Sequence, residues 1–151
     1  MLERFKTVLV TTDFSEHGDH AIAHAFRIAA DNGCPVVLCH VIETVVTPSP
    51  LYAQYYPTDL ITPEIRARAE QDATQALLDR VPKAKPLSDV AHSVKLAHGS
   101  PAREIVHLGE TVGADLIVIS TRGHTGLKHI VLGSVVERVI RHAHCAVLVV
   151  R

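Results

Sequence analysis

The sequence carries almost no excess of charge, because 15 basic and 16 acidic residues leave a net charge of −1 with histidine neutral. Such a chain has no global field to attract nucleic acid or an anionic membrane, so any anion site must be built locally. It has no apolar run approaching the roughly 20 residues that a membrane span needs. Its first residues, MLERFKTVLVTTDF, turn polar too soon for a signal peptide. We therefore expect neither nucleic acid nor membrane among its partners.

Cysteine is also scarce. Cys34, Cys39 and Cys145 form no CxxC pair and fit no zinc-ligand spacing. An odd cysteine count without a secretory signal is typical of reduced thiols, so we expect a cytoplasmic protein. Among the eleven histidines, His20 and His24 stand one helical turn apart, but no third ligand is near them, and no dedicated metal site is predicted.

Four short apolar runs do not alternate with polar residues, which is typical of strands buried on both faces of a parallel sheet. A fifth run, at 91–99, alternates and indicates a strand at a sheet edge. The four apolar runs lie at 7–10, 35–41, 116–119 and 146–150.

Helical patterns separate these runs. Their expected starts are Ser15, Pro63 after the N-cap Thr62, Pro101 after Ser100, and Ser134, which has capping-box spacing to Glu137. The last helix is expected to bury Val135, Val139 and Ile140. Strands and helices thus alternate along the chain, which predicts one domain over residues 1–151. The predicted α/β fold is an open, five-stranded parallel sheet with helices on both faces.

Three of the chain's eight glycines fall in ISTRGHTGLKHIVLGSVVERV, between positions 123 and 133. Gly123 and Gly126 carry no Cβ and so allow a backbone to approach a ligand closely. Gly133 and Ser134 stand at an expected helix start, whose free N–H groups favour an anion. In open parallel sheets, ligands bind beyond the carboxyl ends of strands, where the strand order reverses. We therefore predict a crevice between the ends of the first and fourth strands.

The connection after the second strand, ETVVTPSPLYAQYYPTDLIT, holds all three tyrosines and three prolines. Connections this long are usually functional or mobile. A lid, a contact surface for a partner and plain disorder are equally consistent with its composition.

The glycine spacing resembles the signature of universal stress proteins, in their nucleotide-binding branch, which reads Gly-x2-Gly-x9-Gly-Ser/Thr. Gly123, nine further residues and Gly133-Ser134 match its last part. VLVTTDFSEHGDHAIAHAFRIA, LCHVIE, HGSPAREIVHLGETVGADLIVIS and CAVLVVR also resemble the family, so the resemblance covers nearly the whole chain. Ser120 departs from the signature at its first glycine, and Thr11 stands where the family often has proline. Serine is compatible with the loop if its backbone avoids positive φ.

The resemblance implies a Rossmann-like fold of the adenine nucleotide alpha hydrolase kind and ATP, ADP or AMP as ligand. By matching position, the Asp13 carboxylate would contact the adenosine part, the Val41 backbone would meet adenine, and Thr12 would line the same crevice. The phosphates would lie against Ser120, Arg122, Gly123, Gly133, Ser134 and Val135. Any Mg²⁺ would bind the phosphates instead of a protein cage. A homodimer paired through strand 146–150 is also implied, and it would cover an apolar edge.

Judged without the resemblance, Asp13 and Ser134 could also have simpler, structural roles. Asp13 could cap the first helix with Glu16 as its partner, and Ser134 could cap the last helix with or without a ligand. For the whole protein we expect a regulatory nucleotide-binding stress protein with at most slow hydrolysis, since no general base is evident. The alternatives are a dimeric interaction protein that no longer binds nucleotide and a true enzyme on the same scaffold.

Overall fold

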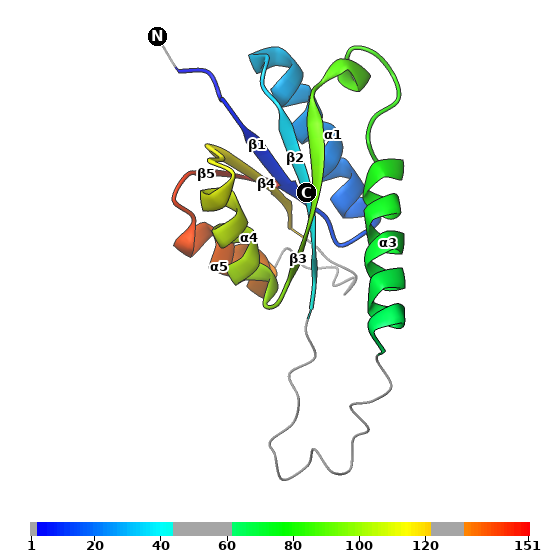
Figure 1. Ribbon diagram of the computed structural model, residues 1–151. Helices are drawn as coiled ribbons and strands as arrows, with labels where there is room; N and C mark the ends of the chain where they lie inside the picture. Colours follow the sequence, from blue (N-terminus) through cyan, green and yellow to red (C-terminus); the bar gives the residue numbers. More distant parts are fainter. Residues whose placement is uncertain (1–2, 44–61, 122–131) are drawn as a thin grey trace.

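The protein forms one five-stranded parallel sheet with strand order β3-β2-β1-β4-β5 (Figure 1). The structure is a computed structural model and describes residues 3–43, 62–121 and 132–151. The predicted α/β fold with an open parallel sheet is confirmed, and run 91–99 is indeed an edge strand. The strands are β1 (Val8–Thr11), β2 (Val36–Ile42), β3 (His92–His98), β4 (Leu116–Ser120) and β5 (Ala146–Val150).

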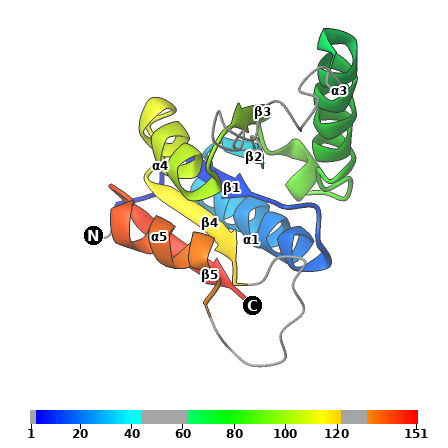
Figure 2. The same ribbon diagram turned by 90° about the horizontal axis from the view of Figure 1, so that it is seen from below.

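Helices cover both faces of the sheet, with α1 and α3 on one side and α4 and α5 on the other (Figure 2). No helix in the described part of the chain has the length and apolar character that crossing a membrane takes. The helices are α1 (Glu16–Asn32), α3 (Pro63–Asp79), α4 (Pro101–Thr111) and α5 (Ser134–His142), with a short 3₁₀ turn at Leu87–Asp89.

Strand β1 joins the two layers of the core, because all of its residues are buried. Val8 and Val10 pack on the α1 side with Phe26, whereas Leu9 packs on the other side with Ile105 of α4. This two-sided burial is the reason why the run shows no alternation with polar residues.

Two helix starts have side-chain caps, and the sequence predicted the cap at Thr62. The Ser15 hydroxyl accepts the Gly18 N–H at 3.2 Å, and the Thr62 hydroxyl accepts the Ile65 N–H at 3.3 Å. Each bond satisfies one of the N–H groups that a first helical turn leaves without a partner. Helix α1 ends at Gly33, whose φ of 69° is left-handed.

The predicted cap of α5 is wrong. Gly133 is the N-cap and Ser134 is already the first helical residue, so Ser134 and Glu137 form no capping box. Glu137 instead forms an ion pair with Arg141 at 2.8 Å, one turn later.

The predicted buried face of α5 is also partly wrong. Val136 and Val139, three residues apart, are the buried pair. Val135 is half-buried and Ile140 is 45% exposed. Helical spacing alone could not choose between neighbouring faces, because valines fill three of the helix's first six positions.

Helix α3 is attached to the sheet by a narrow contact. Leu77 is its one buried residue, and Ile65 near its start is 54% exposed. The connection 44–61, for which three roles stay open, lies outside the described residues, and so does the loop 122–131.

Candidate functional site

A cavity of about 650 Å³ opens at the carboxyl ends of β1, β2 and β4. Because β1 lies between β2 and β4, the strand order reverses here, as the sequence predicts for the crevice. Its volume is within the range typical of small-molecule sites. Arg122 and Gly123 lie outside the described residues. All other predicted contact residues line the cavity, namely Thr12, Asp13, Val41, Ser120, Gly133, Ser134 and Val135.

Internal hydrogen bonds shape the turn that follows β1. The Thr12 hydroxyl accepts the Phe14 N–H at 3.0 Å. The Asp13 carboxylate accepts both the Ser15 N–H, at 3.0 Å, and the Ser15 hydroxyl. The simpler role, in which Asp13 caps α1 with Glu16 as its partner, is therefore wrong. The N-cap is Ser15, and Asp13 holds Ser15 in place.

Phe14 has a φ of 65°, a left-handed backbone that bulky residues rarely adopt. It is the one non-glycine residue with positive φ in the part of the chain that the structure describes. Ser120 therefore avoids positive φ, and the condition under which serine can replace the first signature glycine is met. Nothing in the sequence marked Phe14, since its unusual backbone depends on the contacts around it.

The backbone of Val41 faces the cavity because the pairing between β1 and β2 stops early. The last pair is Thr11 with Cys39, followed by the bond from the Thr12 N–H to the Cys39 carbonyl at 3.0 Å. Backbone groups alternate in direction along a strand, so Val41 faces the same side as Cys39. A continued ladder would join the Val41 N–H to the Thr12 carbonyl, but His40 Nδ1 donates to that carbonyl instead, at 2.8 Å.

Two helices begin at the cavity, α4 at Pro101 and α5 at Ser134. Neither start has a hydrogen bond from a capping side chain, in contrast to α1 and α3. The first-turn N–H groups of α5 therefore keep the partial positive charge of a helix N-terminus directed at the cavity. This arrangement suits an anionic group.

The charged side chains of the cavity are acidic among the described residues. Asp13 and Glu43 line it, and no lysine or arginine of the described ranges does. Within the described residues, positive character therefore comes from the helix starts. No group of three metal-ligating side chains occurs in the described part of the chain.

Cys39 lies under the site but takes no part in its chemistry. It is fully buried, and desolvation raises the pKa of its thiol to about 12 despite a hydrogen bond with the Thr11 side chain. The thiolate, which is the nucleophilic form, is therefore absent at neutral pH.

The sequence did not predict His40 as a cavity residue. It falls in the apolar run 35–41, which predicts a strand buried on both faces, but it is half-buried and lines the cavity. Its place before Val41, at the end of a strand next to the reversal point, was the signal that could have found it.

The fold and the cavity together define an open parallel α/β protein with a cavity at its topological switch point, which is where ligands bind in such sheets. The chain belongs to the universal stress protein family, because residues 4–151 match the model of that family. It is 37% identical over 147 residues to universal stress protein MJ0531 of Methanocaldococcus jannaschii, which covers 97% of this chain and 82% of that protein. To YxiE of Bacillus subtilis it is 33% identical over 148 residues, covering 97% and 99%.

Solved structures also match this fold. MJ0577 of Methanocaldococcus jannaschii matches this fold with a TM-score of 0.76 at 30% identity, over 98% of this chain and 96% of that one. A universal stress protein solved in complex with cAMP matches with a TM-score of 0.60 at 26% identity, over 99% and 98%.

Proposed function

We propose that this protein binds an adenine nucleotide (ATP, ADP or AMP) in the cavity at the ends of β1, β2 and β4 and serves as a regulatory module of the stress response. The observation that carries the proposal is the pairing of a carboxylate, Asp13, with a helix start at Gly133 that no side chain caps, both lining one cavity. A nucleotide offers the complementary groups, hydroxyls at one end and phosphates at the other. The cAMP complex of a relative supports the choice of adenine.

The adenosine part binds at the β1 and β2 side. Asp13 accepts from a ribose hydroxyl or from an adenine N–H, as a carboxylate does. The Val41 backbone, directed past the end of β1, offers the donor and acceptor pair that an adenine edge requires. Thr12, only 4% exposed, lines the same wall, with its hydroxyl already accepting from Phe14.

The phosphates bind at the β4 and α5 side, where Ser120 ends its strand and the backbone N–H groups of Ser134 and Val135 open the helix. Among the described residues, a Cβ at Gly133 would meet only the Thr121 carbonyl oxygen, at 3.6 Å, so these residues leave this side of the glycine accessible. Arg122 and Gly123 complete the proposed contacts from the loop. Any Mg²⁺ binds through phosphate oxygens.

Hydrolysis is at most slow. Efficient phosphoryl transfer relies on cationic side chains that neutralise the developing charge. Among the described residues, no lysine or arginine lines the cavity. Single-turnover release of phosphate from ATP and Mg²⁺ tests this point, and release within minutes would make the protein an enzyme.

We also propose that the protein is a single-domain, cytoplasmic homodimer that pairs through β5. In the described part of the chain this strand pairs with β4 alone, and its Val147, Leu148 and Val149 are half-buried. An apolar edge strand is prone to pair with another strand, and a second copy satisfies it by two-fold symmetry.

A second candidate is a dimeric interaction protein without nucleotide, which the replacement of the first signature glycine by Ser120 favours. Thermal unfolding with and without millimolar ATP or AMP distinguishes the two. A ligand at about 100 times its dissociation constant stabilises the folded state by about 2.7 kcal/mol. An unchanged unfolding temperature with both nucleotides would favour the second candidate, whereas nucleotide found by mass spectrometry in the purified protein would exclude it.

A further inference from the structure

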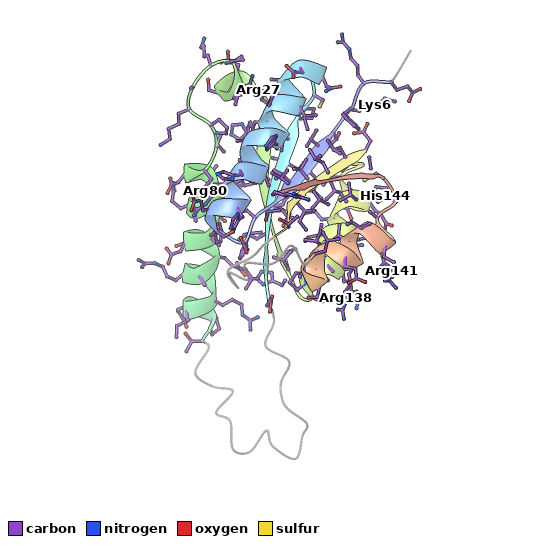
Figure 3. The ribbon with its side chains drawn as sticks, turned by 180° about the vertical axis from the view of Figure 1, so that it is seen from behind. Lys6, Arg27, Arg80, Arg138, Arg141 and His144 are labelled. Atoms are coloured by element: carbon purple, nitrogen blue, oxygen red, sulfur yellow. The ribbon has the colours of Figure 1, made fainter. Side chains whose placement is uncertain are left out.

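Arg80, the C-cap of α3, joins that helix to the turn after β1. Its Nε donates to the Asp19 carboxylate of α1 at 2.9 Å, Nη1 to the Ala76 carbonyl at 3.0 Å and Nη2 to the Phe14 carbonyl at 3.2 Å. Figure 3 shows Arg80 where α3 faces α1. The side chain is 27% exposed and does not line the cavity, so any effect on a ligand must act through other residues.

The Phe14 ring contacts both Arg80 and His40. The guanidinium carbon of Arg80 is 4.9 Å from the centre of the ring, a cation–π distance, and the His40 ring centre is 4.2 Å from it. Phe14 is also the residue with the left-handed backbone. Such a conformation persists only where surrounding contacts hold it, and Arg80 contacts both the carbonyl and the ring of Phe14.

His40 contacts Phe14 and also lines the cavity. Its Nδ1 donates to the Thr12 carbonyl, the acceptor to which the Val41 N–H would bond in a continued strand. While His40 occupies that carbonyl, the Val41 backbone stays directed at the cavity. Asp13, between Thr12 and Phe14, is held by the same turn.

We propose that Arg80 is a positioning residue of the ligand site: by holding Phe14 against His40, it keeps Asp13 and the Val41 backbone directed at the cavity. The proposal rests on the nucleotide-binding function for its effect on affinity. It also couples the docking of α3 to the ligand site, because that helix buries only Leu77 and Arg80 makes its polar contact with α1. By linkage, a ligand that requires the ordered turn strengthens the docking of α3.

Amide hydrogen exchange on the ligand-free protein tests the positioning directly. Arg80→Met keeps the length of the side chain and loses its donors, and Arg80→Lys keeps the charge but not the planar fork. The matched control is Arg68→Met, which removes the same charge from an exposed site on the same helix. The reporters are the N–H groups of Phe14, Ser15 and Gly18, whose acceptors all lie within the turn.

We expect exchange at these three amides to be at least about tenfold faster in Arg80→Met than in Arg68→Met, with Arg80→Lys in between. The Nδ1 proton of His40, seen by NMR, should shift or broaden only in the Arg80 variants. Equal exchange in Arg80→Met and Arg68→Met would overturn the positioning role.

Calorimetric titration with AMP then measures the consequence for binding. We expect the dissociation constant to rise about tenfold in Arg80→Met and to stay unchanged in Arg68→Met. Faster exchange with unchanged affinity would mean that Arg80 stabilises the turn without serving the site, which also overturns the proposal. If the wild type binds no adenine nucleotide, the proposed function is wrong, whatever Arg80 does. Amide exchange in the ligand-free protein still shows whether Arg80 orders the turn.

Discussion

Gly18 in the first turns of α1 approaches Thr12 so closely that a Cβ at Gly18 would overlap the Thr12 hydroxyl oxygen. The same Cβ would also come within 3.3 Å of the Asp13 carboxylate. The start of α1 therefore lies directly against the turn that shapes the cavity, and a helix residue sets how close the two can be. The helix position favours alanine by its intrinsic propensity, so the glycine is explained by this contact.

Gly18→Ala should destabilise the protein by about 1–3 kcal/mol, because the added methyl group forces Thr12 or the helix to move. Urea unfolding measures the loss. In the Thr12→Ala background most of the overlap is gone, and the same change should be neutral or stabilising. A stabilising effect of Gly18→Ala in the wild-type background would contradict the contact.

Gly133→Ala should leave the fold intact and weaken phosphate binding. The φ of Gly133 is −60°, which alanine adopts freely, and within the described ranges its Cβ would make only an ordinary contact with Thr121. The methyl group would stand where phosphate oxygens meet the start of α5, so we expect AMP and ATP affinity to fall about tenfold or more. Adenosine, titrated in parallel, is the control and should bind as before. An equal loss for adenosine would place the phosphates elsewhere.

Asp13→Asn should weaken adenosine, AMP and ATP alike. Asparagine keeps an oxygen for the Ser15 N–H, so the turn survives while the charge is lost. Hydrogen bonds to a charged group contribute about 1.5–3 kcal/mol, so affinity should fall by roughly 10- to 100-fold. The control is Asp31→Asn, at an exposed position late in α1. If only ATP binding suffers, the proposed contact with the adenosine part is wrong.

Stability should fall at alkaline pH because of Cys39. Burial raises the pKa of its thiol from 9.0 to about 12, so between these pH values the unfolded chain releases a proton that the folded protein keeps. The free energy of unfolding should therefore be largest below pH 9 and decrease by at most about 1.4 kcal/mol per pH unit above it. Burial raises the pKa of Cys34 and Cys145 as well, which acts in the same direction.

Urea unfolding at pH 7.5 and pH 10 measures this effect. Cys39→Ala should reduce the difference between the two pH values, although it lowers stability at both by leaving a small cavity. Cys145→Ala, at a half-buried position, should reduce the difference less. If Cys39→Ala loses as much stability between pH 7.5 and pH 10 as the wild type does, groups other than Cys39 cause the loss.

Val147→Pro should abolish the proposed dimer without unfolding the protein. The Thr121 N–H bonds to the Val150 carbonyl at 2.8 Å, so Val150 and Leu148 face β4 and the N–H of Val147 faces the open edge. Proline removes that donor and leaves the β4 ladder in place. Light scattering after gel filtration gives the mass. Val147→Ala keeps the donor and should remain dimeric, and a dimeric proline variant would exclude pairing through β5.

The sequence predicted the arrangement of elements because burial on both faces of a sheet leaves a local trace. Run 116–119 shows it without knowledge of its neighbours, and the alternation at 91–99 marked an edge strand. For run 146–150 the predicted burial on both faces is wrong, because this strand forms the other edge of the sheet and only Val150 is buried. The glycine spacing predicted the family as well, and the family model confirms it.

The start of α5 was less accessible to sequence reasoning. Gly133 and Ser134 are both acceptable caps, and successive valines satisfy more than one helical face, so only packing against the sheet chose Gly133 and the buried pair Val136 and Val139. The strand-end position of His40 was visible in the sequence, but its bond to Thr12 was not.

By itself, the amino-acid sequence determined the fold class, the order of strands and helices, and the edge of the sheet at which a ligand site would form, since each depends on hydrophobic period and local caps. The tertiary structure alone decided which side chains meet there. Gly18 against Thr12, His40 on the Thr12 carbonyl and Arg80 on Phe14 join residues from different elements. Such contacts depend on how elements pack in three dimensions, and packing between residues distant along the chain leaves no periodic trace in a single sequence.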